Sequence, residues 1–163
     1  MKIEVLRHHL EYSRWATRWV LEAAGALTPE NLTRDFQTSE RSVLGTLAHV
    51  FGGDRVWLQR VQGHPQPTFL EPEDRALEAL QRQWPAVHQA WIELLAAETE
   101  ESLGRRIAYR DLKGIPWETP LWQILFHLVN HGTHHRGQVS GFLRAMGETP
   151  PPLDLIAYYR SLG

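Results

Sequence analysis

Residues 119–147 read TPLWQILFHLVNHGTHHRGQVSGFLRAMG and repeat an apolar side chain at three- and four-residue steps. This spacing places the apolar side chains on one face of a helix. Thr119 suits the cap before a helix, Pro120 suits its first position, and Gly147 is typical of its end. The sequence therefore predicts a helix from Pro120 to about Met146 with one buried face. That face contains Leu121, Ile124, Leu125, Leu128, Val139, Phe142, Leu143 and Met146.

Two histidines interrupt this apolar face. His131 and His135 lie four residues apart, so their rings are neighbours on the helix surface. Two buried imidazoles without a partner are costly, whereas two rings one turn apart can bind one metal ion together. We therefore interpret His131 and His135 as metal ligands. His127 and His134 lie to one side of the face.

Three further stretches show helical periodicity, over residues 2–27, 43–62 and 73–99. Pro85 lies inside the third stretch, but the apolar stripe keeps its phase across it, which predicts one kinked helix. Residues 105–119 indicate an irregular hairpin or an extended loop.

Residues 153–160 indicate one or two terminal helical turns. Together the segments predict an all-α four-helix bundle, with a short irregular hairpin or loop before the fourth helix. No composition shift suggests a domain linker, so we expect a single domain over residues 1–163.

A third metal ligand should come from another helix, and His49 is the candidate. Gly52 and Gly53 follow His49 at the positions that neighbour it on the helix surface. Glycine in a helix costs about 1 kcal/mol relative to alanine, so this pair suggests close helix approach or cleared space. On spacing alone, His49 is as consistent with a hydrogen-bonded core histidine as with a ligand. Three imidazoles suit Zn²⁺ or Ni²⁺ and leave a coordination position open.

Other polar residues near these histidines have several interpretations. Gln138 lies three residues beyond His135 and can hold a ligating ring or a bound substrate. Asp54 is at least as consistent with a cap or a surface charge as with a supporting role. Arg136 is expected to form a salt bridge to an adjacent helix. The remaining histidines, which we expect to be solvated, are His8, His9, His64 and His88.

The composition excludes several classes of protein. The chain has 163 residues and no cysteine, so it has no disulfide, no thiolate ligand and no cysteine nucleophile. A net charge of −2 argues against nucleic-acid binding. The apolar runs are too short for a membrane span and the N-terminus lacks a signal peptide, so we expect a cytoplasmic protein.

The chain resembles the DinB/YfiT-like family of metal-dependent proteins. The resemblance is carried by Leu47-Ala48-His49 with Asp54 and Trp57, and by the run from His127 to Gln138. It implies a four-helix bundle, often a homodimer, with a divalent metal held at the positions of His49, His131 and His135. The tryptophans Trp15 and Trp19, four residues apart, could cover such a subunit interface, line a pocket or pack in the core.

The resemblance also implies a reaction class, because relatives transfer low-molecular-weight thiols to electrophiles. A thiol bound to a metal loses its proton without a protein base, and the sequence shows no carboxylate beside the histidines. We therefore expect a thiol transferase acting on a small-molecule substrate. The alternatives are a metal-dependent hydrolase and a non-catalytic, metal-stabilised stress or binding protein. Gly132 stands where a zinc protease of the H-E-x-x-H type has its glutamate, which disfavours that protease chemistry.

Overall fold

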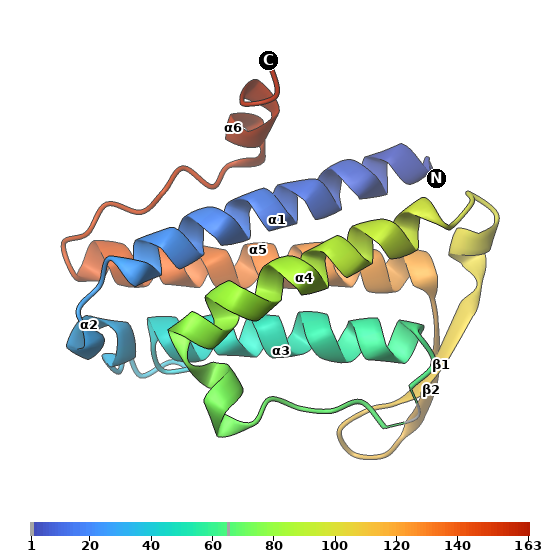
Figure 1. Cartoon of the computed structure of the whole chain (residues 1–163), viewed down its shortest axis with the longest axis horizontal. Coiled ribbons are helices and arrows are strands. Elements are labelled where there is room, and N and C mark those ends of the chain that lie inside the picture. The colour runs from blue at the N-terminus through green and yellow to red at the C-terminus, as the bar shows by residue number, and fades with distance from the viewer. Residues whose placement is uncertain (1, 65) are drawn as a thin grey trace.

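The computed structural model describes residues 2–64 and 66–163, and four long helices make up most of it (Figure 1). These are α1 (Ile3–Gly25), α3 (Val43–Val61), α4 (Leu77–Ala96) and α5 (Leu121–Ala145). The short elements are α2 (Pro29–Thr33), the 3₁₀ turns η1 (Pro72–Arg75) and η2 (Ser102–Gly104), and α6 (Leu155–Arg160). The long helices begin and end within a few residues of the predicted positions. As predicted, α4 continues as one helix through Pro85.

The long helices pack in pairs around a common interior. Helix α1 contacts α4 and α5, and α3 contacts the same two helices (Figure 1). Two apolar clusters fill the space between them. One is built around Phe51, Leu80 and Trp84, and the other around Leu121, Ile124 and Leu125. Burial of these side chains is the main stabilising contribution to the helical core.

A regular β-hairpin precedes α5, where the sequence predicted an irregular hairpin or loop. Strand β1 (Arg106–Arg110) pairs antiparallel with β2 (Pro116–Pro120) over five residues each, so the chain is mostly helical with a small sheet. The side chain of Asp111 accepts hydrogen bonds from the backbone N–H groups of Lys113 and Ile115. Together with Gly114, whose φ is +79°, these bonds close a tight turn that keeps the strands in register.

Asp54 and His88 are both buried, which corrects the predicted exposure of His88 and excludes the surface-charge interpretation of Asp54. Asp54 on α3 is 6% exposed and accepts a hydrogen bond of 2.8 Å from Trp84 Nε1 on α4. His88 is 7% exposed, with Nε2 3.5 Å from the same carboxylate. The carboxylate therefore ties α3 to α4 inside the core, and helical spacing alone could not reveal this contact.

Arg136 on α5 is also buried, and the predicted salt bridge to an adjacent helix is wrong. Its Nη1 donates to Ser13 Oγ at 3.1 Å and to Thr17 Oγ1 at 3.4 Å, both on α1. Among residues 2–64 and 66–163, no carboxylate lies within salt-bridge distance of it. A Cβ at Gly132 would lie 2.7 Å from Arg136 Nη1, so this glycine clears room for the buried guanidinium.

Helix α6 packs on α1 and partly covers Trp15. The rings of Trp15 and Tyr158 lie 5.6 Å apart, and those of Trp15 and Trp19 lie 6.4 Å apart. Both tryptophans are half-buried within the chain itself. The homodimer therefore stays a prediction.

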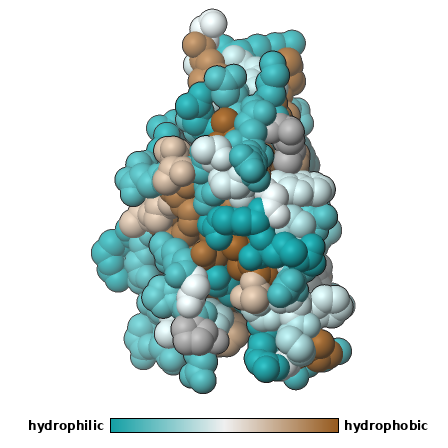
Figure 2. Space-filling view, turned by 90° about the vertical axis from the view of Figure 1, so that its right-hand side faces the viewer, coloured by the Kyte–Doolittle hydropathy of each residue, from teal (hydrophilic) through white to brown (hydrophobic). Residues whose placement is uncertain are grey.

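The outer surface at the end that holds the hairpin is mainly hydrophilic, with a narrow apolar area in its middle (Figure 2). Among the residues described, no helix combines the length and the apolar character needed to cross a membrane.

The packing predicts how two leucine substitutions affect stability. Leu125→Ala removes a side chain that is 0% exposed and should lower the free energy of unfolding by about 2–5 kcal/mol. The matched control Leu112→Ala alters a side chain that is 81% exposed and should change it by less than about 0.5 kcal/mol. Urea denaturation followed by circular dichroism measures both. Equal losses would contradict this description of the core.

Candidate metal centre

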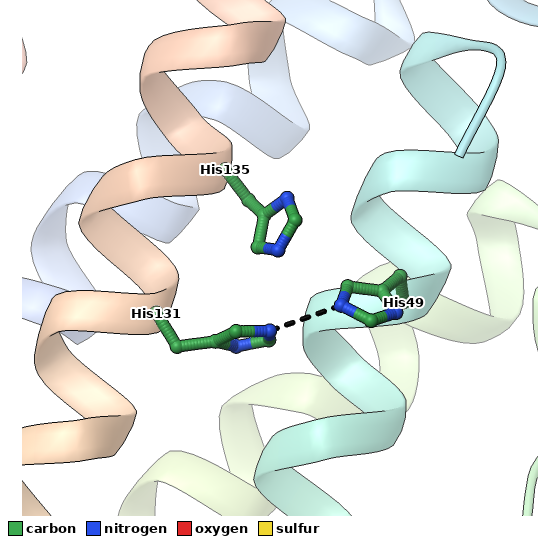
Figure 3. A group of neighbouring side chains, drawn as sticks. All are labelled: His49, His131 and His135. Carbon is green, nitrogen blue, oxygen red and sulfur yellow. Dashed lines mark hydrogen bonds between the residues drawn. The ribbon is translucent and has the colours of Figure 1, made fainter. Parts of the chain in front are cut away.

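Three histidines meet between α3 and α5. His49 comes from α3, and His131 and His135 come from successive turns of α5 (Figure 3). Each offers one ring nitrogen, and the three nitrogens lie within 4.8 Å of one another. His49 Nε2 and His131 Nε2 are 3.0 Å apart. The structure thus brings together the three residues that the sequence singled out as ligands.

A glycine allows the two helices to approach at this point. A Cβ at Gly53 would lie 3.3 Å from His131 Cε1, so a larger side chain there would press on the ring. The neighbouring Gly52 faces Leu70 instead, at 3.3 Å from Leu70 Cδ1. Of the two glycines that follow His49 in the sequence, Gly53 is therefore the one that makes room for the histidine cluster.

Polar side chains lie behind two of the three rings, and one of them, Gln138, forms a hydrogen bond. Gln138 Oε1 lies 2.7 Å from His135 Nδ1 and accepts a hydrogen bond from its N–H group, which leaves the lone pair on Nε2. Glu40 Oε1 lies 3.6 Å from His49 Nδ1, and His49 Nε2 faces the other rings. Carboxylates and amides behind ligating histidines fix ring orientation in metal sites.

Sequence reasoning missed Glu40 because it precedes α3 and belongs to no helical stripe. A Cβ at Gly45 would lie 2.1 Å from the Glu40 carbonyl oxygen, so the loop before α3 folds tightly over its first turn. In the sequence, the one indication of this close approach is the glycine at position 45, inside the first turn of α3. The expectation that no carboxylate lies beside the histidines was wrong.

His131 and His135 favour the neutral form that a metal requires. Burial, followed by the proximity of His135 and His49, lowers the pKa of His131 to about 4. Burial also lowers the pKa of His135, although its hydrogen bond to Gln138 opposes the shift. At neutral pH, His131 is therefore uncharged, with a lone pair on one of its two ring nitrogens.

The donor set fits a divalent metal ion. Two nitrogens that bind one zinc ion tetrahedrally at 2.0–2.1 Å lie about 3.3 Å apart, close to the 3.0 Å between His49 Nε2 and His131 Nε2. Imidazole nitrogens suit zinc, nickel and other late divalent metals. Among the residues described, the group has three members and no fourth donor. His127 lies beside His131, with ring centroids 5.5 Å apart, and His134 is exposed.

A cleft of about 450 Å³ opens beside His49 and His131. Its walls are largely apolar, with Val56, Trp57, Phe69, Leu70 and Leu112 among the lining side chains. A larger cavity of about 860 Å³ between α1, α4 and α6 is lined by none of the three histidines, so it does not serve this centre.

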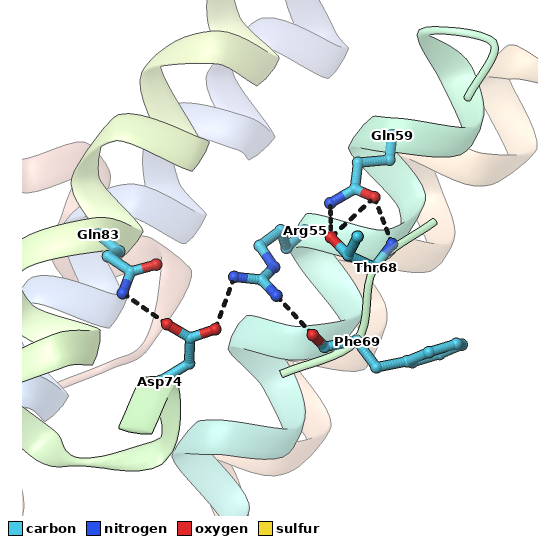
Figure 4. Close-up of polar contacts among 6 residues, drawn as sticks. All are labelled: Arg55, Gln59, Thr68, Phe69, Asp74 and Gln83. Carbon is cyan, nitrogen blue, oxygen red and sulfur yellow. Dashed lines mark hydrogen bonds and ion pairs between the residues drawn. The ribbon is translucent and has the colours of Figure 1, made fainter. Parts of the chain in front are cut away.

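The segment that carries Phe69 and Leu70 is fastened to the helices (Figure 4). Arg55 donates to Asp74 Oδ2 at 3.0 Å and to the Phe69 carbonyl oxygen at 2.7 Å. Gln59 accepts from the backbone N–H of Thr68 at 2.7 Å. These bonds hold the outer wall of the cleft against α3, so the cleft is a fixed part of the fold.

Gly53 offers a direct test of the geometry. Gly53→Ala and the control Gly141→Ala each replace a helical glycine, and a Cβ at Gly141 meets nothing within 4 Å. Both substitutions should stabilise the helix by about 0.5–1 kcal/mol, and at Gly53 the contact with His131 should offset this gain. Zinc affinity, measured by competition with a chromogenic chelator, should fall about tenfold in Gly53→Ala alone. Equal zinc affinity in the two variants would show that Gly53 does not position His131.

Comparisons with known proteins agree with the fold. The sequence profile of the DinB family matches residues 1–162. Protein DinB of Bacillus subtilis (strain 168) is 24% identical over 156 residues, covering 91% of this chain and 90% of that protein. Protein YizA of the same organism is 23% identical over 134 residues, covering 80% of each chain. The crystal structure of a DinB-like protein from Bacillus cereus ATCC 10987 has a TM-score of 0.63 at 24% identity, covering 88% of this chain and 94% of that one. The chain belongs to the DinB family.

Proposed function

We propose that this chain is a metal-dependent transferase, built on a four-helix bundle, that joins a low-molecular-weight thiol to a small electrophile. His49, His131 and His135 would hold the divalent ion. The observation that carries the proposal is a set of three imidazole nitrogens, within 4.8 Å of one another, beside a largely apolar cleft. Three protein ligands leave a coordination position for an exogenous molecule, as reactive sites do.

A divalent ion bound there would act as a Lewis acid that lowers the pKa of a thiol or a water in the remaining position. In the transfer, the sulfur forms a bond to the electrophilic carbon while the leaving group departs with the bonding electrons. The thiol proton passes to solvent.

The protein's own residues prepare the site for this reaction. Gln138 keeps the proton of His135 on Nδ1, and Glu40 lies where it favours a proton on His49 Nδ1. Both interactions direct Nε2 lone pairs toward the shared position. The apolar walls of the cleft exclude water from a bound thiol and electrophile.

A hydrolase is the second candidate, and Glu40 favours it. Hydrolysis needs a group that accepts a proton from water, and Glu40 lines the cleft beside His49. The third candidate is a non-catalytic protein in which the ion only ties α3 to α5. In that case the binding free energy would appear as folding stability alone.

The proposal first requires metal binding. Protein purified without an affinity tag or added metal should retain about one divalent ion per chain by plasma mass spectrometry. The double variant His131→Ala/His135→Ala should lose it, because one imidazole cannot hold the ion. The control His8→Ala changes an exposed histidine on α1 and should retain the metal. Stoichiometric metal in the double variant would refute the assignment of the ligands.

The reaction is tested with a fluorogenic electrophile. Zinc-loaded protein should accelerate conjugation of monochlorobimane with at least one of glutathione, coenzyme A and bacillithiol. The acceleration should disappear in His135→Ala and after chelation, and should return when zinc is restored to the wild-type protein. His8→Ala should match the wild type.

Two other outcomes would replace the proposal. If no thiol is conjugated above background but a panel of esters and amides is turned over, the protein is a hydrolase. If neither panel reacts while zinc raises the melting temperature, the metal has a structural role.

A further inference from the structure

One face of α3 runs from the histidine cluster to Arg60. His49, Gly53, Trp57 and Arg60 follow one another at steps of four, four and three residues, so they share this face. All four line the cleft beside the histidines. From Gly53 to Arg60 the helix rises about 10 Å, and long helical side chains lean back toward the N-terminus. The Arg60 guanidinium is therefore within the length of a small molecule from the candidate metal.

The Arg60 guanidinium packs against the rings of Trp57 and Tyr109, which also contact each other edge to face with centroids 4.8 Å apart. Its carbon lies 4.6 Å from the centre of the Trp57 ring and 4.8 Å from that of Tyr109. Contact with two aromatic rings restrains the guanidinium and so favours its binding to a planar, charged partner. Trp57 also contacts His127, with ring centroids 5.6 Å apart, so its ring lies between Arg60 and the histidines.

This cation is buried, and no carboxylate of the described residues is in salt-bridge contact with it. Arg60 is only 8% exposed, and among the residues described its Nε has no hydrogen-bond partner. The charge of Asp111 acts on Arg60, but that carboxylate already accepts from Trp117 Nε1 and from backbone N–H groups. Burial of a cation without an ion-pair partner costs free energy, and a bound anion that reaches the guanidinium would recover part of it.

We propose that Arg60 is a substrate-binding residue that receives a carboxylate of the molecule bound in the cleft. This inference rests on the proposed function and narrows its substrate class. The ligand carries a carboxylate about 10 Å from the atom that meets the metal, with an apolar portion against Trp57. An extended tripeptide spans about this length. The carboxylate belongs either to the thiol or to the electrophile.

Arg60 also has a structural contact that the test must separate. Its Nη2 donates to the Arg110 carbonyl oxygen at 2.9 Å, which helps hold the hairpin against α3. It lines a second cavity as well, beneath the hairpin. Loss of the side chain could therefore loosen the fold without any role in binding. The test therefore uses the ratio of two ligand affinities measured on the same variant. A loss of folded protein lowers both affinities equally, so the ratio does not change.

The experiment measures binding by isothermal titration calorimetry and needs no turnover. Glutathione is compared with its diethyl ester, and 4-methylbenzoate with 4-methylbenzamide, each against zinc-loaded protein. Wild type should bind the carboxylate member of one pair about tenfold more tightly, a difference of about 1.4 kcal/mol. In Arg60→Met the preference should fall to about twofold or less, and in Arg60→Lys it should be intermediate. The control Arg82→Met removes an exposed cation elsewhere and should keep the preference.

The two pairs distinguish the source of the carboxylate. A preference confined to the glutathione pair assigns it to the thiol, and one confined to the benzoate pair assigns it to the electrophile. Either supports the subsite, even if no conjugation is detected and the proposed transferase activity fails. Absence of any preference in wild type, or a preference that survives in Arg60→Met, would overturn the subsite and leave the transferase proposal standing.

Discussion

Close packing of α3 against α5 is the constraint on which the candidate site depends. It brings His49 to within 3.0 Å of His131, a residue 82 positions later in the chain. Three imidazoles in such a space are favourable only while they are neutral, and burial lowers the pKa of His131 to about 4 for this reason. The absence of a side chain at Gly53 makes the approach possible. The packing of α3 against α5, the neutral state of His131 and the positions of the ring nitrogens therefore depend on one another.

Buried polar groups hold the surrounding helices in matching positions. Asp54 binds α3 to α4 through Trp84, and Arg136 binds α5 to α1 through Ser13 and Thr17. Buried charges add little net stability, but breaking such contacts is costly, so they select one packing arrangement over others. The helices that carry the histidines are each tied in this way to a helix that carries none.

Much of this architecture follows from local patterns in the sequence. The three- and four-residue apolar spacing predicted each long helix to within a few residues, because a helix with one buried face must have that period. The same spacing placed His131 and His135 on the interior face. The glycines after His49 indicated a close approach, although only the structure shows that Gly53, and not Gly52, faces a histidine.

The remaining features depend on contacts between distant segments, which periodicity does not encode. The sequence predicts a solvated His88 and leaves a surface position open for Asp54, yet both are buried, with His88 Nε2 3.5 Å from the Asp54 carboxylate. Glu40 reaches His49 from a loop, and Arg60 stacks on Tyr109 of the hairpin. In each case, the side chain is placed by contact with another segment of the chain, and no local sequence pattern connects the two residues.

X-ray absorption spectroscopy of the zinc-loaded protein tests most directly whether the three histidines form a metal centre that is open to an exogenous ligand. We expect three imidazole nitrogens at about 2.0–2.1 Å with one further light atom, which a sulfur at about 2.3 Å replaces when 2-mercaptoethanol is added. Four protein ligands that do not change on addition of the thiol would contradict this expectation.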